Sequence, residues 1–438
     1  MGFTLKPVRV GICGFGTVGG GTFNVLQRNS DEITRRTGRA IVVEHIAQRR
    51  PNVDCDTGDT AITDDIFAVA NNPNVDVLVE LIGGHEPAKE LVLTAIRNGK
   101  HVVTANKALI AVHGNEIFEA ARKHNVVVAY EAAIAGGIPI VKAIREGLSA
   151  NSINWLAGII NGTGNFILTE MRDKGRAFAD VLKEAQELGY AEADPTFDVE
   201  GIDAAHKLTI LASVAFGMPL QFDKAYTEGI GKLSLEDVSN AEELGYRIKH
   251  LGITRIHDEG VELRVHPTLI PEHQLIAKVD GVMNSVLVDG DAVGQTLYYG
   301  AGAGSEATAS AVIADLVDVA RVKHSGGKVS VPYLGFAQDR LNSLPIMPIE
   351  EITSAYYLRM TAEDHPGVLA KVASIMSDLG INIESVMQKE SEREGSEIPL
   401  VMMTHEVKER QINQAIEMVE ALPTIIGSVA RIRVEHFN

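Results

Sequence analysis

The sequence is poor in cysteine, in aromatic residues and in long apolar runs. Cys13 and Cys55 are the two cysteines of the 438 residues, so the disulfide framework typical of small secreted proteins is excluded. This scarcity predicts a reducing, cytoplasmic location. No apolar run of the sequence approaches the roughly 20 residues that cross a bilayer, so we expect no membrane partner.

Positive charge is also scarce. The 40 Lys and Arg residues stand against 58 Asp and Glu residues, which gives a formal net charge of −18. A surface of this sign repels nucleic acid and anionic lipid, so we expect neither as the main partner. Hydrophobic residues make up 45% of the chain, which at this length predicts two or three domains with cores of their own.

The first part of the chain alternates short apolar runs with helix-like segments. Buried strands are predicted at residues 8–12, 41–47, 75–82 and 126–129, and helices at 17–28, 88–98 and 109–124. This alternation predicts an α/β fold with a parallel sheet that helices cover on both faces. We assign it to residues 1–135, and we expect a later helix at 305–325 to pack back on this domain.

The remainder of the chain has a different pattern. Longer strands are predicted at 153–160, 262–270, 275–282 and 286–288, and helices at 138–148, 177–188 and 202–216, which indicates an α+β domain over 136–304. Glycine and proline mark residues 326–352 as a linker. Residues 353–438 have the element order βαββαβ, which predicts a ferredoxin-like domain.

A glycine-rich turn directly follows the first predicted strand and precedes a helix. Its residues are Gly14, Phe15, Gly16, Thr17, Val18 and Gly19. Glycine at positions 14, 16 and 19 allows a tight turn and a close approach of the backbone to a pyrophosphate, which the helix N-terminus attracts. We therefore predict a Rossmann-type dinucleotide-binding domain.

The end of the second predicted strand indicates which dinucleotide binds. NAD-binding domains usually place Asp or Glu there, but this strand runs into Arg49 and Arg50, and Glu44 falls inside it. Two guanidinium groups suit a 2′-phosphate, so we predict NADP, with NAD still possible. The alternative is a solvated arginine pair on a loop.

A dense group of ionisable residues precedes and enters the predicted helix at 202–216. It contains Glu192, Asp198, Asp203 and Lys207. Asp203 and Lys207 are four residues apart on the helix and therefore share a face. Such a pair is most often a surface ion pair, but apolar neighbours make it costly here unless it serves a function.

The segment 185–207 resembles the signature of homoserine dehydrogenases, through Gly189, Asp194, Pro195, Asp198, Gly201, Asp203 and Lys207. Residues 104–107, which end in Lys107, also resemble this family, and the likeness extends over about residues 6–350. It implies reversible reduction of L-aspartate 4-semialdehyde to L-homoserine with NAD(P)H, in the biosynthesis of threonine, methionine and isoleucine. A homodimer or homotetramer is expected.

The resemblance also implies roles for individual residues. Lys207 is expected to be the proton donor, with Lys107 beside the nicotinamide and the reacting oxygen. Glu192 and Asp203 are expected to hold the substrate ammonium, and Asp198 to orient the pocket. For a buried lysine, burial lowers the pKa and a neighbouring carboxylate opposes that change, and the sequence leaves the outcome open.

Two further groups of residues take roles from the resemblance. Gly189 and Gly304 are expected to contact the cofactor. The family's monovalent-cation segment corresponds to residues 131–139, which implies sodium coordination, mainly by backbone carbonyls; its ligands are expected to be Glu131, Ile134, Gly136 and Ile138.

The C-terminal domain resembles an ACT regulatory domain, with Asp364, Gly367 and Asn382 at the family's ligand positions. This implies feedback inhibition by an amino acid, for which we predict L-threonine. The linker suggests a separable module, so that a chain ending near residue 350 should keep catalysis and lose inhibition. The alternative is a purely structural sheet for dimerisation.

Two other functions compete with this interpretation. A non-catalytic protein that binds nucleotide and amino acid only as signals is expected to have lost Lys207, Asp203 or Glu192, and all three are present. An enzyme that oxidises aspartate semialdehyde through a thioester needs a poised thiolate. Neither Cys13 nor Cys55 lies in a pattern typical of a nucleophile.

Overall fold

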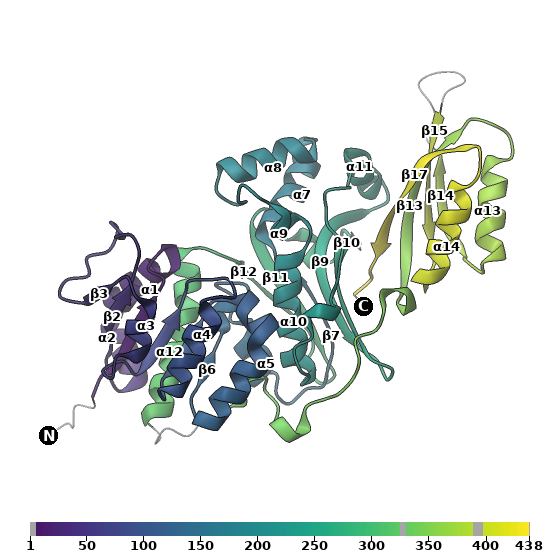
Figure 1. The fold of residues 1–438 in the computed structure, drawn as a ribbon. Coiled ribbons are helices and arrows are strands. Elements are labelled where there is room, and N and C mark those ends of the chain that lie inside the picture. The colour runs from purple at the N-terminus through teal and green to yellow at the C-terminus, as the bar shows by residue number, and fades with distance from the viewer. Residues whose placement is uncertain (1–5, 325–329, 389–396, 438) are drawn as a thin grey trace.

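The computed structural model describes residues 6–324, 330–388 and 397–437, which form two sheets with helices around them (Figure 1). Residues 326–329 of the predicted linker, and residue 325 of the segment predicted to pack back, lie outside the described residues. In the described part of the chain, no helix has the length and apolar character that crossing a membrane requires.

The first sheet is entirely parallel and has the strand order β3-β2-β1-β4-β5-β6. Its strands are β1 (Val8–Cys13), β2 (Ile41–Ala47), β3 (Ala61–Thr63), β4 (Val77–Glu80), β5 (His101–Thr104) and β6 (Val128–Ala129). This is the order of a dinucleotide-binding Rossmann sheet, in agreement with the predicted fold.

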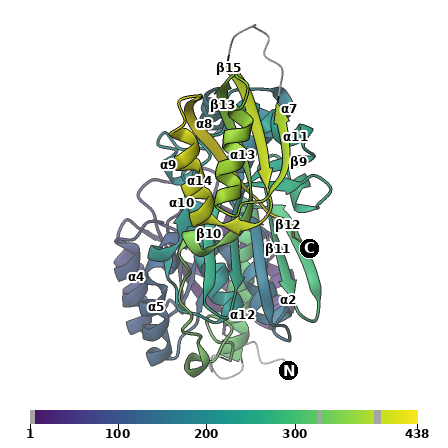
Figure 2. The ribbon, with the colours of Figure 1, turned by 90° about the vertical axis from the view of Figure 1, so that its right-hand side faces the viewer.

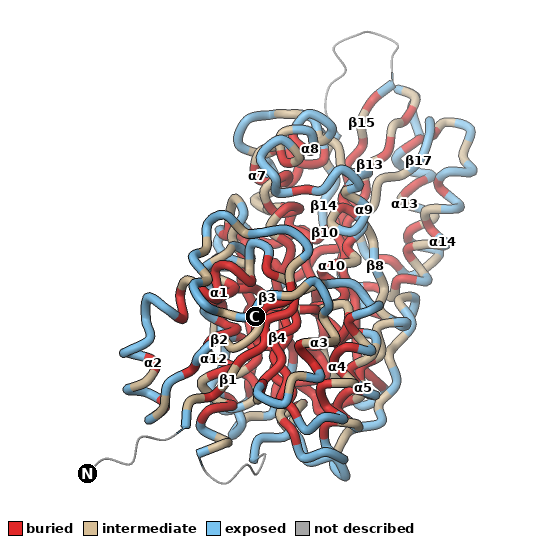
Figure 3. The backbone as a smooth tube through the Cα atoms, turned by 60° about the vertical axis from the view of Figure 1, so that its left-hand side comes forward, coloured by how far each residue is buried: buried red, intermediate tan, exposed pale blue. Residues whose placement is uncertain are grey.

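Side-chain alternation along these strands divides the domain into two cores. In β4, Val77 and Val79 point into one core and Leu78 into the other, as a period of two requires. Helices on both faces cover the sheet, and its strands lie inside the molecule (Figure 3). The covering helices are α1 (Thr17–Arg28), α2 (Ser30–Thr37), α3 (Ile66–Asn71), α4 (Ala88–Arg97), α5 (Lys107–His124) and, from much later in the chain, α12 (Ser305–His324).

Helix α12 lies beside α1, although nearly 280 residues separate their sequences (Figure 1). A Cβ atom added to Gly21 would lie 2.3 Å from Ser305 Oγ, so α1 needs glycine where the two helices meet. Ser305 Oγ also donates to the Thr17 carbonyl at 2.8 Å. The nucleotide-binding domain is therefore built from two distant pieces of the chain.

The second sheet has the order β12-β11-β7-β9-β10-β17-β13-β15-β14, with β8 and β16 paired at its sides. The strands of its first part are β7 (Ile153–Ile159), β8 (Tyr226–Thr227), β9 (Tyr246–Ile256), β10 (Val261–Pro271), β11 (Met283–Gly290) and β12 (Gly294–Ala301). Its second part has β13 (Thr353–Glu363), β14 (Ile383–Gln388), β15 (Glu397–Thr404), β16 (Val407–Lys408) and β17 (Ile425–Val434).

Helices cover this sheet and connect it to the first domain. They are α6 (Ile140–Lys142), α7 (Gly162–Lys174), α8 (Phe178–Glu187), α9 (Thr196–Val199), α10 (Ile202–Phe216), α11 (Leu235–Glu243), α13 (Val368–Asp378) and α14 (Glu409–Glu420). Helix α10 is buried from Asp203 to Phe216, and it packs between α5 of the nucleotide-binding domain and the strands β9 and β10.

One predicted element is wrong: the expected strand at 275–282 contains a short 3-10 turn, Ile276–Lys278. The predicted helix at 138–148 is present over residues 140–147, as α6 followed by a π-helix, Ala143–Gly147. Strands β9 and β12 were not expected. The polar residues Arg247, Lys249 and His250 interrupt the apolar pattern of β9, although Lys249 and His250 are buried.

The C-terminal domain has the predicted βαββαβ order, and it continues the second sheet (Figure 2). Its last strand pairs in parallel with β10 at Thr268 and Arg433 and at Leu269 and Val434. Apolar residues of both domains also share one core, including Ile167, Leu168 and Val238 on one side and Tyr357, Val401, Met403 and Ile432 on the other.

Buried ion pairs reinforce this junction. Arg433, 1% exposed, donates to Glu409 at 2.7 Å within its own domain and to Glu228 of the neighbouring domain at 2.8 Å. Arg359 donates to Asp237 of α11 at 2.6 Å. The separable module stays a prediction, and the core and ion pairs that the two domains share count against it.

A chain that ends at residue 350 should be markedly less stable than the full chain. This truncation removes the C-terminal domain, exposes the shared core and leaves Glu228 without its partner Arg433. We expect melting at least about 5 °C lower, with self-association at concentrations where the full chain stays dispersed. Calorimetry and size-exclusion chromatography measure both, and Asp364→Ala in the full chain is the control. Equal melting temperatures would contradict the shared core.

Candidate active site

The glycine turn after β1 has the geometry that a dinucleotide requires. Gly14 has φ +94°, and a Cβ atom added there would lie 2.5 Å from the Leu81 carbonyl oxygen. A Cβ atom on Gly19 would lie 2.2 Å from the Gly14 oxygen, whereas one on Gly16 would meet nothing within 4 Å. Gly14 and Gly19 therefore close the turn, and Gly16 leaves open space where a phosphate can approach the backbone.

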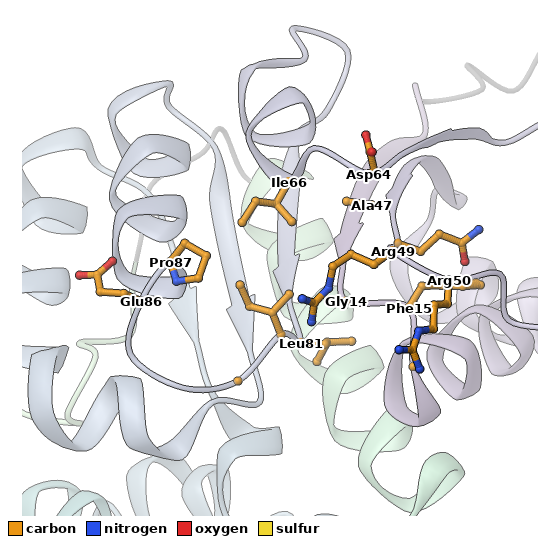
Figure 4. A pocket seen from close by; sticks show the side chains of 14 residues that line it. Gly14, Phe15, Ala47, Arg49, Arg50, Asp64, Ile66, Leu81, Glu86 and Pro87 are labelled. Atoms are coloured by element: carbon orange, nitrogen blue, oxygen red, sulfur yellow. The ribbon is translucent and has the colours of Figure 1, made fainter.

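A cavity of about 860 Å³ opens beside this turn (Figure 4). Gly14, Phe15 and Gly16 line it together with Arg49 and Arg50 from the loop after β2. Glu86 and Pro87 stand across the cavity in Figure 4. The cavity therefore combines a phosphate-binding turn with two guanidinium groups, as predicted from the sequence.

One residue that lines this cavity, Asp64, and one buried residue behind its wall, Glu80, were missed from the sequence. Asp64, which follows β3, lines the cavity and supplies a carboxylate near the arginines. Glu80 is fully buried at the end of β4, where it accepts from Thr104 Oγ1 at 2.6 Å and from the backbone N–H groups of Ile82 and Gly83. Glu80 thereby shapes the loop that forms one wall. The sequence signal for Glu80 was its position as a charged residue at the end of an apolar strand.

Of the other predicted cofactor residues, some lie beside the glycine turn and one does not line the cavity. Thr17 and Val18 open α1, and Thr17 accepts the hydrogen bond from Ser305, which follows Gly304. Gly304, with φ +126°, therefore lies beside the glycine turn. Gly189 is in an exposed turn after α8 and does not line the cavity.

A second group of predicted residues meets around a single carboxylate. Asp203 Oδ1 lies 2.9 Å from Lys107 Nζ, and its Oδ2 lies 2.7 Å from Lys207 Nζ. Asn161 Nδ2 donates to Asp203 Oδ2 at 2.9 Å and to Asp198 Oδ1 at 2.7 Å. Lys207 also donates to the Ile160 carbonyl at 2.6 Å. We call Lys107, Asn161, Asp198, Asp203 and Lys207 the lysine–carboxylate cluster.

Four elements position this cluster, and Asp198 comes from the short helix α9. Lys107 is the first residue of α5, which Asn106 caps by accepting from the Leu109 N–H at 3.0 Å. Asp203 and Lys207 lie one turn apart on buried α10. Asn161 follows β7 and caps α7 by accepting from the Gly164 N–H. The sequence missed Asn161 as a cluster member, although an Asn between a strand and a glycine-rich helix start is a recognisable cap.

The pKa values of the two lysines are shifted in opposite directions. Burial lowers the pKa of Lys207 and outweighs the attraction of Asp203, with the positive charge of Lys107 adding to the reduction. Burial also opposes the charge of Lys107, but Asp203, Asp198 and Glu192 together raise its pKa. The pKa of Asp203 is lowered, because both ammonium groups outweigh its burial. Lys207 is thus the better acid of the two.

The remaining predicted substrate residues differ in exposure. Burial raises the pKa of Asp198, which is half-buried. Glu192 is exposed, and it acts on the Lys107 ammonium through its charge alone. His206, which the sequence did not single out, stacks on Phe222 at 4.1 Å between ring centroids and contacts Phe197, whose ring faces Lys107. Its pKa is lowered to about 4 by burial, so it is neutral near pH 7.

The predicted cation segment forms a tight loop against the glycine-rich residues before α12. Ala135 and Gly136 both have left-handed backbone, at φ 51° and 42°, and a Cβ atom on Gly136 would lie 2.7 Å from the Gly302 oxygen. The Glu131 side chain is buried and accepts from the N–H groups of Val141 and Lys142, both at 2.9 Å. Burial and Asp315 raise the pKa of Glu131 to about 7.

The predicted effector residues lie at opposite ends of α13 and are not brought together within the chain. Gly367, with φ +91°, is the residue before α13, and Asp364 is exposed in the preceding loop. Asn382 is exposed before β14, and its carbonyl accepts from the His405 N–H at 2.9 Å. The free N–H groups of an 11-residue helix therefore face an open loop that carries the carboxylate of Asp364, whereas the amide of Asn382 lies beyond the other end of this helix.

Neither cysteine has the environment of a nucleophile. Burial raises the pKa of the Cys13 thiol far above its usual range, and Glu80 and Asp65 add to this effect. Burial also raises the pKa of Cys55. Thioester chemistry needs the thiolate at neutral pH, so these two thiols argue against the oxidising alternative.

Comparison with known proteins covers all three domains. Residues 14–131 match the family described as "Homoserine dehydrogenase, NAD binding domain", residues 139–317 match "Homoserine dehydrogenase", and residues 356–424 match "ACT domain". A homoserine dehydrogenase of Pseudomonas aeruginosa is 69% identical over 434 residues, which are 99% of this chain and 100% of that protein.

Solved structures agree with these matches. The crystal structure of a homoserine dehydrogenase from Thiobacillus denitrificans has a TM-score of 0.94 at 60% identity and covers 99% of both chains. A hyperthermophilic archaeal homoserine dehydrogenase in complex with NADPH has a TM-score of 0.61 at 25% identity, over 73% of this chain and 98% of its own.

Rossmann domain, lysine-bearing helix and regulatory domain thus occur here in the arrangement of one known oxidoreductase family. The chain belongs to the homoserine dehydrogenase family, with a nicotinamide cofactor domain and a C-terminal ACT domain.

Proposed function

We propose that the chain reduces L-aspartate 4-semialdehyde to L-homoserine, reversibly, with Lys207 as the proton donor. One observation carries this proposal: a single buried carboxylate, Asp203, holds two ammonium groups 2.9 and 2.7 Å away. Reduction of an aldehyde produces negative charge on its oxygen, and paired ammonium groups can stabilise that charge and supply the proton.

The nicotinamide, when bound, supplies the hydride to the aldehyde carbon. The chain's residues then act on the oxygen. Lys207, whose pKa burial lowers, donates its proton to the oxygen. Lys107, whose pKa is raised, remains an ammonium and stabilises the developing charge beside the nicotinamide. As pH rises through the lowered pKa of Lys207, the reduction slows because the neutral amine cannot donate.

The substrate ammonium needs carboxylates of its own. Both oxygens of Asp203 already contact lysines, so its first role is to hold Lys107 and Lys207 rather than to bind substrate directly. Glu192 is exposed and Asp198 is half-buried, and both act electrostatically on Lys107, so they lie within reach of a substrate bound there. We assign the ammonium to these two carboxylates.

For the cofactor, we propose NADP as the preferred dinucleotide and NAD as a possible second one. Arg49 and Arg50 line the cavity and suit a 2′-phosphate. The archaeal relative solved with NADPH supports this preference. Asp64, which lines the same cavity, can instead accept from ribose hydroxyls, and this makes NAD binding chemically reasonable.

We also propose sodium at the 131–138 loop. Among the backbone hydrogen bonds of the described residues, the carbonyls of Glu131 and Ile138 accept from Ile134 and Ile140, whereas the carbonyls of Ile134 and Gly136 accept none. Unpaired carbonyl oxygens in a left-handed loop suit a hard monovalent cation. The ion would fix the loop against the residues that lead into α12.

Assembly and location extend the proposal. The strands β12 and β14 end the second sheet, and their outer edges pair with no described strand. Tyr299 and Val386 on these strands are 59% and 41% exposed. Such edges favour pairing with another copy, so we propose a homodimer or homotetramer. Both cysteines are free, which suits a cytoplasmic protein.

Lys207→Met should abolish turnover while NADP binding and the fold remain. The substitution removes the proposed acid, and Asp203 keeps its contacts with Lys107 and Asn161. Loss of a general acid costs about 10²–10⁴ in rate. Stopped-flow kinetics with aspartate semialdehyde measures turnover, and fluorescence titration with NADPH measures cofactor binding. The control is Lys89→Met, which removes a lysine of α4 that pairs with Glu116 outside the cluster. A kcat within about threefold of wild type would move the acid role to Lys107.

Replacing Arg49 and Arg50 together by alanine should weaken NADP far more than NAD, because the 2′-phosphate is present in NADP alone. A charge-assisted hydrogen bond contributes about 1.5–3 kcal/mol. Dissociation constants for both dinucleotides, measured on the same preparations, give the comparison. Arg97→Ala, an exposed arginine of α4 paired with Glu90, is the control. Equal losses for both cofactors would refute the assignment.

We propose that L-threonine inhibits the enzyme from the loop that contains Asp364 and Gly367. The helix N-terminus binds its carboxylate, and Asp364 accepts from its ammonium. Asp364→Ala should therefore raise the threonine concentration for half-inhibition about tenfold or more, with unchanged rates in its absence. Initial rates of the full chain against rising L-threonine test this. Asp378→Ala, at the other end of α13, is the matched control. Inhibition that is unchanged in Asp364→Ala would remove the effector from this loop.

A further inference from the structure

Asn161 links the two carboxylates of the lysine–carboxylate cluster. It is 5% exposed, and its Nδ2 donates to Asp198 Oδ1 at 2.7 Å and to Asp203 Oδ2 at 2.9 Å. A side-chain amide has two N–H donors, so each carboxylate takes one of them. The carboxylates come from different helices, α9 and α10. One neutral group therefore fixes their relative position.

The orientation of this amide is determined by the helix that it caps. Asn161 Oδ1 accepts from the Gly164 N–H at 2.7 Å at the start of α7. With the oxygen held there, the NH₂ group faces Asp198 and Asp203. A rotated amide would lose the cap and would bring its oxygen against two carboxylates, which are acceptors alone when ionised. The cap therefore selects the orientation in which both carboxylates receive a hydrogen bond.

The two carboxylates differ in what remains free. Both oxygens of Asp203 are occupied, because they contact Lys107, Lys207 and Asn161. Asp198 Oδ2, in contrast, has no hydrogen bond or ion pair with a residue that the structure describes. Asp198 thus keeps one oxygen for a ligand.

Asn161 is also the direct partner of Asp198. Neither lysine pairs with Asp198 at contact distance, although the charges of Lys207 and Lys107 act on it from further away. Burial raises the pKa of Asp198, and the hydrogen bond from Asn161 opposes that change. Without the amide, the negative charge of Asp203 would repel an Asp198 side chain that nothing else holds in place.

We propose that Asn161 is a positioning residue that directs the free oxygen of Asp198 towards the substrate ammonium. The inference rests on the proposed function, in which Asp198 and Glu192 bind that ammonium. Asn161 acts through the carboxylate that it holds. A neutral donor suits this role, because a cation at the same place would pair with Asp198 and compete with the substrate.

Asn161→Ser tests the role, because serine also caps helices but its single short O–H cannot hold two carboxylates. We expect the KM for L-aspartate 4-semialdehyde to rise about tenfold or more. The kcat should stay within about threefold of wild type, since Asp203 keeps both lysines. Initial rates at saturating NADPH measure both constants. An unchanged KM would overturn the proposal.

A pair of inhibitors shows whether Asn161 acts through the ammonium. L-Homoserine carries this group, and 4-hydroxybutanoate is the same molecule without it. In Asn161→Ser the inhibition constant of L-homoserine should rise about tenfold or more, while that of 4-hydroxybutanoate stays within about twofold. A purely structural role would weaken both inhibitors alike, and equal losses would overturn the proposal.

A matched control and a double-mutant cycle complete the test. Asn165→Ser removes another buried asparagine of α7, whose Nδ2 donates to the Val279 and Met283 carbonyls, and it should leave the KM unchanged. In an Asp198→Asn enzyme, adding Asn161→Ser should change the L-homoserine constant by less than about twofold, because no carboxylate remains to be directed. A further tenfold loss in the double variant would overturn the proposal.

Two outcomes separate this inference from the proposed function. No reduction of L-aspartate 4-semialdehyde by the unaltered enzyme would refute the proposed function. Normal turnover with an unchanged KM in Asn161→Ser would refute the role of Asn161 alone. If the melting temperature shows that Asn161→Ser unfolds, Asn161→Thr repeats the measurements, because threonine is another capping residue without an amide.

Discussion

The active site depends on one buried carboxylate. Asp203 accepts from a lysine at the start of α5, from a lysine one turn along its own helix and from an asparagine at the end of β7. These groups belong to the nucleotide-binding domain, to α10 and to the second sheet. A buried aspartate would be costly alone, and a buried Lys207 equally so. Because each compensates for the other, the charge pair also fixes how the two domains approach at the site.

The parts of this arrangement that could be predicted are those with a local pattern in the sequence. The Gly14–Gly19 turn, helix α1 and helix α10 follow from spacing alone, because local backbone geometry and a continuous apolar pattern determine them. Strand β9 was not expected, since Lys249 and His250 look solvent-exposed in sequence and are in fact buried with partners. A polar residue whose partner lies far along the chain gives no local signal.

The docking of the ACT domain could not be predicted for the same reason. Its composition and element order identify it, but the contact of Arg433 with Glu228 spans 205 residues. The linker composition suggested independence, whereas pairing of β17 with β10 makes the domain part of the substrate domain's sheet. Contiguous packing therefore connects the ACT domain with β10, and β10 through β9 and α10 with the lysine–carboxylate cluster.

The position of α12 has a consequence for synthesis. Residues 8–129 supply the strands of the Rossmann sheet, but α12, which covers one of its faces, leaves the ribosome only after the entire substrate domain. Until then, apolar residues such as Val10, Ile12 and Phe23 lack part of their cover. The first domain to emerge is thus among the last to be completed, and the nascent chain carries an exposed sheet face for nearly two hundred residues of elongation. Early engagement by a chaperone, or early folding of the substrate domain, would protect that face.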